Sequence, residues 1–345
     1  MTAPWRITAG NAPSTPPPHP WMAAFDAVVA EWENGQPTAH TSGSTGPPLT
    51  HRFHPDAVRA SAHATAAHFG LNGNSIRTWS ALPAAGTGGR MAVWRALILG
   101  WELTVNLPSS TPDVAIPSGP NSNRFDFGVA TPMQAQHLME SGQLGRFQQL
   151  LLGGAPLGPA LEDALLEAGR ESACRIHVGF GMTETLTHIA TRSLGSEAYR
   201  PLPGVTVHIG ADQALIVDSP LRGVQQLHTR DAAQWMSAND TSAFRWLGRL
   251  DDVLNSGGIK VHPHNVERLL SPLVQGMLDA RRWYVCGRAD ETLGDRITLV
   301  LEGAPQEGLT ETLLEACKDL GNIRPRSVEF LGVFEETASG KVLRK

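Results

Sequence analysis

The sequence predicts a large α/β domain, a β-rich subdomain after it and a small α+β domain at the carboxyl end. The chain has 345 residues, of which 41% are hydrophobic, so it can bury a large core and suggests two domains rather than one. Short strands, glycines and helices alternate between residues 125 and 181, which is typical of a sheet that binds ligands at its strand ends. After Gly204, two short apolar strands flank a polar turn and indicate a hairpin.

Proline and glycine delimit the helices of the first half. Proline opens a helix readily and glycine closes one, so Pro132 and Pro159 mark helix starts while Gly70 and Gly100 mark helix ends. The predicted helices cover residues 56–69, 90–99, 132–140 and 159–169, and the predicted strands cover 125–130, 148–152 and 175–178. The residues that follow the last of these strands, 179–181, are expected to form a tight turn.

A second unit is predicted to start near Leu250. The hairpin strands at 205–209 and 214–217 precede it. Within it we expect helices at 266–270 and 311–320 and strands at 282–286, 296–301 and 328–333. Roughly a hundred residues is a reasonable size for a domain that folds on its own. We therefore predict a large domain at 1–249 and a small one at 250–345.

Composition excludes several classes of function. The net charge is −5 and the isoelectric point is about 6.2, which argues against a nucleic-acid partner because phosphate binding needs clustered Lys and Arg. No apolar run approaches the ~20 residues of a membrane span. The three cysteines are widely spaced without a CxxC pattern, which favours free thiols in a reducing compartment. We expect a cytoplasmic protein without a membrane span.

The most informative segment of the chain consists only of glycine and hydroxyl-bearing residues. Its members are Thr41, Ser42, Gly43, Ser44, Thr45 and Gly46. Bare backbone N–H groups and hydroxyls can wrap a polyphosphate. The segment lacks the GKS/T ending of a Walker loop. A flexible linker of the same composition is the competing interpretation, and the downstream motifs favour the phosphate loop.

Three further segments are ordinary when each is taken alone. In GFGMTE, Phe180 can stack on a flat ring, Thr183 can donate to a phosphate and Glu184 can hold a divalent metal. GRLDD and NSGG, between residues 248 and 258, would otherwise be a solvated linker with a turn. SGK at 339–341 ends in a lysine close to the chain terminus, where most chains merely fray.

Together these segments resemble the adenylate-forming superfamily of acyl- and aryl-CoA ligases. The matches occur in family order between residues 41 and 345: TSGSTG, GGAPL, GFGMTET, HTRD, GRLDD, NSGG and SGKVLRK. The resemblance implies that superfamily's fold, shortened at the N-terminus and with a mobile small C-terminal domain. It also implies an ATP-dependent, AMP-forming ligase whose small-molecule substrates are ATP, a carboxylic acid and CoA, with Mg²⁺ as the cofactor.

The resemblance assigns a role to each matching residue around the nucleotide. Residues 41–46 would clasp the β- and γ-phosphates, Thr183 would contact the α-phosphate, and Glu184 would bind Mg²⁺. The residues implied at the adenine and the ribose are Gly153, Gly154, Ala155, Phe180, Gly181, Asp231 and Arg249. Lys341 would bridge the substrate carboxylate and the α-phosphate. Such a cation is needed because a carboxylate that attacks a polyphosphate brings like charges together.

A second step, in which CoA displaces AMP, is also implied by the resemblance. In the family the small domain rotates about a hinge between the two steps, and Asp251 matches the hinge position. Gly257 and Gly258 would line the channel for the thiol arm, where a side chain would obstruct it.

Within the superfamily, the chain resembles the short bacterial o-succinylbenzoate–CoA ligases of menaquinone synthesis. TETLTHIA at 183–190 carries this resemblance, together with GGRM at 88–91. It implies that Gly179 and His188 meet the acid, with His188 donating to a substrate oxygen. A helix-surface or core histidine is the alternative for His188. A ligase for another aromatic or acyl acid, an inactive nucleotide-binding relative and an adenylation module for a carrier protein also stay open.

Two residues depart from the family pattern. Leu49 stands where a lysine usually follows the phosphate loop, so His51, Arg52 or the Mg²⁺ ion would have to neutralise the leaving pyrophosphate. His264 stands where a glutamate is usual.

Two structural expectations follow from the rest of the sequence. His262, His264 and Glu267 look superficially like a metal cluster, but surface positions fit them better. The front of the chain is shorter than in typical members, and we therefore consider a homo-oligomer in which a partner subunit covers the exposed flank of the sheet.

Overall fold

The computed structural model of the chain describes residues 4–8, 10, 11, 19–40, 49–73, 75–114, 124–278, 281–335 and 342–344. The chain divides into two compact units. The first consists of Met1–Leu157, Leu161–Val207 and Val217–Leu227, and the second of Gly158–Ala160, His208–Ile216 and His228–Lys345. The domain boundary expected at residue 249 stays a prediction.

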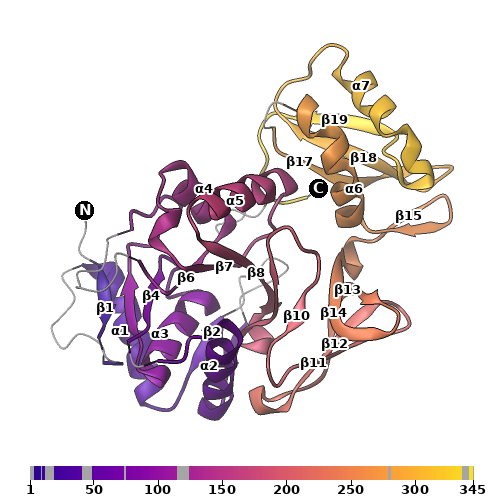
Figure 1. Cartoon of the computed structure of the whole chain (residues 1–345). Coiled ribbons are helices and arrows are strands. Elements are labelled where there is room, and N and C mark those ends of the chain that lie inside the picture. Colours follow the sequence, from indigo (N-terminus) through magenta and orange to yellow (C-terminus); the bar gives the residue numbers. More distant parts are fainter. Residues whose placement is uncertain are drawn as a thin grey trace. The chain divides into compact units, whose positions relative to one another are not determined.

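An eight-stranded sheet forms the centre of the first unit (Figure 1). Its strands, in spatial order, are β1 (Trp5–Ile7), β5 (Glu102–Val105), β4 (Arg77–Ser80), β6 (Phe127–Ala130), β7 (Gln149–Leu152), β8 (Arg175–Met182), β9 (Thr187–Ser193) and β10 (Arg200–Pro201). The strands from β5 to β8 pair in parallel, whereas β1, β9 and β10 pair antiparallel to their neighbours. The parallel part confirms the predicted alternation of strands and helices.

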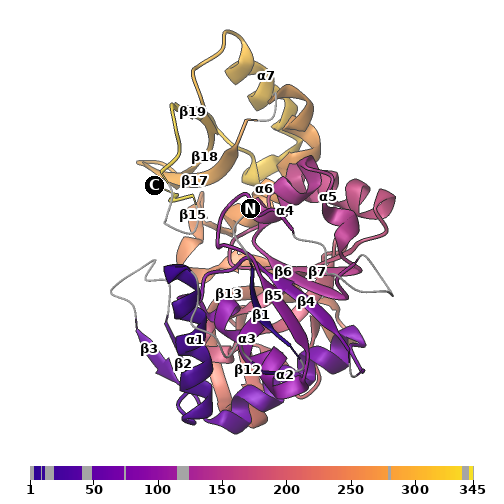
Figure 2. The same cartoon turned by 90° about the vertical axis from the view of Figure 1, so that its left-hand side faces the viewer.

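The helices of the first unit lie on both faces of this sheet (Figures 1 and 2). They are α1 (Pro20–Glu33), α2 (Pro55–Phe69), α3 (Thr87–Leu99), α4 (Pro132–Glu140) and α5 (Pro159–Glu171). α3 connects β4 to β5, while α4 and α5 connect β6, β7 and β8 in the opposite direction along the sheet. Because parallel crossovers are right-handed, α3 and the α4–α5 pair cover opposite faces. The direction changes between β4 and β6, and ligands of such sheets bind where it changes.

Local sequence signals account for the helix ends. α2 begins with Pro55 and ends at Gly70, whose φ of 66° gives the left-handed conformation that closes a helix. α4 begins with a capping box in which Thr131 and Gln134 bond each other's backbone. α3 starts at Thr87, three residues before the predicted start. The helices expected at 56–69, 132–140 and 159–169 are thus confirmed within two residues at each end.

The expected tight turn after residue 178 is wrong. β8 continues as a strand through Gly179, Phe180 and Gly181 to Met182. The reason is the antiparallel strand β9, which pairs with β8 along this stretch and supplies backbone hydrogen-bond partners. The chain reverses only afterwards, in the 3₁₀ turn η2 (Thr183–Thr185).

Two smaller sheets follow in the chain, together with a hairpin near its start. The hairpin pairs β2 (Thr38–His40) with β3 (Thr50–Arg52). One sheet has the order β11 (Thr206–Ile209), β12 (Ala214–Ser219), β13 (Val224–Ser237) and β14 (Asp240–Arg249). The other has the order β16 (Ile259–Val261), β15 (Leu254–Ser256), β18 (Gly294–Glu302) and β17 (Trp283–Asp290), with β19 (Ser327–Leu331) parallel to β18. The hairpin predicted after Gly204 corresponds to β11 and β12.

Two helices complete the second unit. α6 (Pro263–Val274) is longer than the predicted 266–270, and α7 (Leu309–Ala316) is shorter than the predicted 311–320 because a 3₁₀ segment, Lys318–Ile323, follows it. Both helices pack on the β17–β18 strands through one apolar core. The predicted α/β domain, β-rich subdomain and small α+β domain are confirmed as a fold class. In the described part of the chain, no helix is long and apolar enough to cross a membrane.

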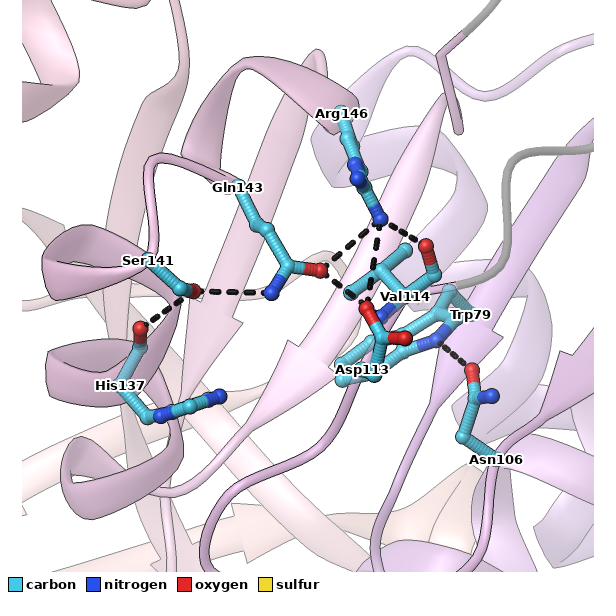
Figure 3. A network of polar contacts seen from close by, with 8 residues as sticks. All are labelled: Trp79, Asn106, Asp113, Val114, His137, Ser141, Gln143 and Arg146. Carbon is cyan, nitrogen blue, oxygen red and sulfur yellow. Dashed lines mark hydrogen bonds and ion pairs between the residues drawn. The ribbon is translucent and has the colours of Figure 1, made fainter. Parts of the chain in front are cut away.

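A polar network supports the segment that follows β5 (Figure 3). The Gln143 side-chain oxygen accepts from the backbone N–H of Val114 at 2.8 Å and from Arg146 at 2.9 Å. Arg146 also donates to the Val114 carbonyl, and the Gln143 amide donates to the Ser141 hydroxyl at 2.8 Å. This network ties the connection between β5 and β6 to the turn after α4.

Replacing Gly89 with alanine is expected to destabilise the first unit. A Cβ atom at residue 89 would lie 2.2 Å from the Pro83 carbonyl oxygen, so the start of α3 would have to move. We expect a loss of about 1–3 kcal/mol in the free energy of unfolding, as is usual for overpacking, measured by urea denaturation. Gly153→Ala is the control, because its Cβ would meet nothing within 4 Å. Equal stability of the two variants would contradict this packing.

Three histidine rings pack around Phe69 at the end of α2. His68, His177 and His188 have ring centroids 4.9, 5.1 and 6.2 Å from that of Phe69. Burial lowers the pKa of all three histidines, to about 4 for His177, where the charges of Arg175 and His68 lower it further. The folded protein therefore binds these protons less readily than the unfolded chain does.

Stability is expected to fall as the pH is lowered below the ordinary histidine pKa of 6.5. The unfolded chain takes up protons first, so acid favours unfolding, and the contribution of His177 continues down to a pH of about 4. Thermal melts between pH 7 and pH 4 measure this slope. His177→Gln should flatten it, and a slope that is the same in both proteins would count against the buried neutral imidazole.

Candidate active site

In the first unit, α3 connects the residue before the predicted phosphate loop, His40, with the surroundings of Thr183. β2 ends at His40, directly before Thr41, and His40 forms a parallel bridge with Gly86 at the beginning of α3. The hydroxyl oxygens of Thr87 and Thr183 are 3.0 Å apart. α3 begins without a side-chain cap. Because N–H groups and the dipole at a helix start attract anions, this corner is suited to phosphate.

Two predicted groups lie outside the described residues: the phosphate loop at 41–46 and Lys341. Leu49, which follows the loop, is described and has 62% of its surface exposed. The ring of His51 stacks on Phe53 with centroids 6.3 Å apart. The roles of the loop, of Lys341 and of a substitute for the missing lysine stay predictions.

The predicted metal ligand Glu184 is a carboxylate on the surface of the first unit. It is exposed and lies in the η2 turn next to Thr183. No group of three or more His, Cys, Asp or Glu side chains among the described residues could hold a metal ion. Mg²⁺ keeps several waters and binds through one or two carboxylates plus substrate phosphates. The residues present therefore fit Mg²⁺ carried by ATP better than a resident metal centre.

The predicted adenine contacts lie at the carboxyl ends of β7 and β8. Gly153, Gly154 and Ala155 follow β7 directly, and Gly154 has a φ of 85°, which favours glycine. Phe180 lies on the neighbouring β8, and its ring meets Tyr199 edge to face with centroids 5.7 Å apart. Because β7 and β8 are parallel, these residues lie toward the same edge of the sheet.

The two residues predicted for the acid are in contact. His188 lies on β9 with 6% of its surface exposed, so the helix-surface alternative is wrong and the residue is a buried one. A Cβ atom at Gly179 would lie 3.3 Å from the His188 Cβ. The two imidazole nitrogens lie 3.3 Å from the Thr187 hydroxyl and 3.4 Å from the Thr65 hydroxyl. Burial, with a contribution from nearby arginines, lowers the pKa of His188 well below 6.5, so the ring is neutral at physiological pH.

Two buried arginines adjoin His188, and sequence reasoning missed both. Arg95 on α3 and Arg222 in the 3₁₀ turn η3 (Pro220–Arg222) have 3% and 4% of their surface exposed. Arg95 donates to the Thr187 hydroxyl at 3.0 Å, and Arg222 donates to the His188 carbonyl at 3.0 Å. One guanidinium nitrogen of each is buried without a hydrogen-bond partner. No described carboxylate pairs with either arginine.

The charge of these arginines is uncompensated. Burial lowers the pKa of Arg222 to about 10, and burial together with the charge of Arg222 lowers that of Arg95 to about 9. Both groups are still cationic at neutral pH, although unpaired buried charges are costly. An anionic ligand would remove this cost. The signal in the sequence was a charge at position 95, in the middle of the otherwise apolar stretch MAVWRALIL.

Backbone strain is concentrated next to this pair. Leu186 and Thr187 have φ angles of 55° and 76°, and positive φ is rare for a β-branched residue. Such conformations cost on the order of 1–3 kcal/mol each and cluster at functional sites. Gly181 accommodates the strained segment, because a Cβ there would lie 2.0 Å from the Thr187 carbonyl oxygen.

In the second unit, the predicted ribose residues Asp231 and Arg249 lie opposite each other on β13 and β14. The Trp246 indole N–H donates to Asp231 at 2.9 Å, and burial raises the pKa of the Asp231 carboxyl. Arg249 forms two hydrogen bonds with Asp251, at 2.8 and 2.7 Å. The predicted ribose arginine is therefore engaged with the predicted hinge residue.

Gly257 and Gly258 form the turn between β15 and β16. Their φ angles are 58° and 81°, so the turn itself favours glycine at both positions. A Cβ at Gly258 would meet nothing within 4 Å. Their predicted role in lining a thiol channel stays a prediction.

Glu267 is not the surface residue that the sequence suggested. Only 6% of its surface is exposed. Its carboxylate accepts the Val285 N–H at 2.8 Å and forms an ion pair with Arg344 at 2.7 Å. The His262 ring instead lies 3.2 Å from the Gln213 side-chain oxygen. The buried glutamate is thus a structural ion-pair partner.

A family model described as AMP-binding enzyme matches residues 38–227, which is more than half of the chain. Among curated proteins, 2-succinylbenzoate–CoA ligase of Lactococcus lactis is 26% identical over 243 residues, 65% of this chain and 52% of that protein. The chain therefore spans about half the length of this relative.

Solved structures show the same fold. An acyl-CoA synthetase (AMP-forming)/AMP-acid ligase II-like protein from Dyadobacter fermentans is 29% identical with a TM-score of 0.63, covering 98% of this chain and 97% of that one. The o-succinylbenzoate coenzyme A synthetase of Bacillus subtilis, solved in complex with ATP and magnesium ion, is 22% identical with a TM-score of 0.71, covering 89% of this chain and 68% of that one. The ordered motifs, the α/β sheet and the family match agree, and the chain belongs to the AMP-binding enzyme family.

Proposed function

We propose that the protein is an ATP-dependent, AMP-forming CoA ligase that activates 2-succinylbenzoate for menaquinone biosynthesis. In the first step a carboxylate oxygen of the acid attacks the α-phosphorus of ATP, and the bond to pyrophosphate breaks. In the second step the sulfur of CoA attacks the acyl carbon, and AMP leaves. Membership in the AMP-binding enzyme family supports the reaction type, and the relatives' substrate supports the acid.

The residues of this chain are proposed to bind and orient the reactants. Residues 41–46 and the start of α3 would hold the phosphates, with Thr183 at the α-phosphate and Lys341 at the attacking carboxylate. Mg²⁺ bound by Glu184 and the phosphates would neutralise charge on the leaving pyrophosphate. Phe180 and residues 153–155 would contact the adenine, and Asp231 the ribose.

The observation that carries the choice of acid is the pair of buried arginines without carboxylate partners, Arg95 and Arg222. 2-Succinylbenzoate has two carboxylates, and one of them is not consumed by adenylation. A second carboxylate needs a cation to enter a low-dielectric interior. A benzoate-type acid would leave both arginines unpaired, so the pair favours a dicarboxylic substrate.

Entry of the acid requires the arginines to become accessible. In the structure Arg95 donates a hydrogen bond to the Thr187 hydroxyl, and Thr187 lies in a segment with positive φ angles. We expect the acid's free carboxylate to replace the Thr187 hydroxyl as the partner of Arg95.

A panel of carboxylic acids tests the function. Purified protein with ATP, Mg²⁺ and CoA is expected to release pyrophosphate and AMP with 2-succinylbenzoate, and at least tenfold faster than with benzoate at equal concentration. Pyrophosphate release and CoA-ester formation are measured separately. Faster reaction with a monocarboxylic acid would contradict the proposed substrate. No pyrophosphate release with any acid would contradict the proposed activity.

Arg95→Met is expected to weaken acid binding without weakening the fold. Loss of a charged hydrogen bond should raise KM for 2-succinylbenzoate by roughly 10- to 100-fold and leave KM for benzoate nearly unchanged. Because the variant removes an unpaired buried charge, its thermal stability should equal or exceed that of the parent. A parallel loss for both acids, or a marked loss of stability, would show that Arg95 is structural.

A further inference from the structure

The last described residues of the chain, 342–344, are anchored on the body of the second unit. The Leu343 N–H donates to the Glu335 carbonyl at 2.8 Å, so the chain is paired on both sides of residues 336–341. Val342 packs against a small apolar cluster that includes the buried Tyr284. The position of the tail is therefore defined by contacts immediately after Lys341.

Arg344 forms an ion pair with Glu267. Its guanidinium meets the Glu267 carboxylate at two points, with nitrogen–oxygen distances of 2.7 and 3.0 Å. It also lies over the Tyr284 ring, with its central carbon 5.8 Å from the centroid. A two-point fork fixes orientation as well as distance, so the tail cannot slip by one residue without breaking it.

Glu267 is itself held by β17 and by its own helix. It lies on α6, and the oxygen nearest to Arg344 also accepts the Val285 N–H of β17 at 2.8 Å. The other oxygen lies 3.7 Å from the His264 ring nitrogen, one turn earlier on α6. A single buried carboxylate thus joins α6, β17 and the tail.

We propose that Glu267 and Arg344 are positioning residues for adenylation, because their ion pair fixes the segment to which Lys341 is covalently joined. This inference rests on the proposed function, in which Lys341 bridges the acid and the α-phosphate. Neither residue touches a reactant; Glu267 acts through Arg344, and Arg344 through the backbone that leads to Lys341. The CoA step does not use Lys341, so it does not depend on the pair.

Separate assays of the two half-reactions test the proposal. Adenylation is followed as acid-dependent exchange of pyrophosphate into ATP, and the CoA step as thioester formation from supplied succinylbenzoyl-adenylate. Arg344→Ala is expected to lower the exchange rate at least tenfold and to leave thioester formation within about twofold. Arg344→Lys keeps the charge without the fork and should give an intermediate exchange rate. If Arg344→Ala does not fold, Glu267→Gln replaces it, because glutamine can still accept the Val285 N–H. This variant should likewise lower the exchange rate and leave thioester formation nearly unchanged.

Arg288→Ala is the matched control. This variant removes an ion pair between β17 and β19, in which Arg288 lies 2.7 Å from Glu329. Both half-reactions should be unchanged in it. Equal loss of both half-reactions in Arg344→Ala, or no loss in either, would overturn the proposal. Lys341→Ala separates this failure from failure of the proposed function. If Lys341→Ala abolishes pyrophosphate exchange and Arg344→Ala does not lower it, the positioning role of Arg344 is wrong and the role of Lys341 is supported. If Lys341→Ala leaves exchange intact, the proposed role of Lys341 in adenylation is wrong.

Discussion

The close antiparallel contact between β8 and β9 is the constraint on which the candidate site depends. At Gly181 the two backbones approach so closely that a Cβ would lie 2.0 Å from the Thr187 carbonyl oxygen and 2.6 Å from the His188 Cα. The pairing register shifts just before this point, after Phe180. Bulges of this kind re-aim side chains and recur next to active sites. Here the turn at 183–185 is exposed at residue 184, whereas His188 is buried.

Uncompensated positive charge is the second feature of the site. Folded proteins pair nearly all of their buried charges, since an isolated ion loses its hydration without gaining a partner. Arg192 illustrates the usual solution, because Glu162 binds it through both carboxylate oxygens. Arg95 and Arg222 lack such a partner among the described residues. Stability sacrificed in this way is typical of sites that gain their missing partner from a ligand.

In the second unit, one continuous set of contacts joins β13, β14, α6 and residue 344. Asp231 accepts from Trp246, whose ring centroid lies 4.5 Å from that of His264, and His264 adjoins the Glu267–Arg344 pair. The predicted ribose residue Asp231 is thus connected through Trp246 and His264 to the ion pair that holds residue 344. A continuous chain of contacts does not by itself mean that these residues are energetically coupled.

Local signals in the sequence were sufficient for the elements and for the order of the motifs. Pro55, Gly70 and Pro132 mark helix ends because backbone geometry and capping act within a few residues, and the structure places the helices accordingly. The sequence did not predict which glycines lie close to another strand. The extension of β8 through residues 179–182 depended on pairing with a later strand, and no pattern inside β8 itself reports that pairing.

By itself, the sequence determined the fold class and the family, because these follow from local geometry and from motifs that occur in a fixed order. Tertiary structure alone decided the burial of Glu267 and the position of both Arg95 and Arg222 beside the segment 187–188. These residues lie on elements far apart in the chain, and burial and charge balance are properties of the packed molecule rather than of any segment. The physical reason is that desolvation depends on all surrounding groups, which only the folded chain brings together.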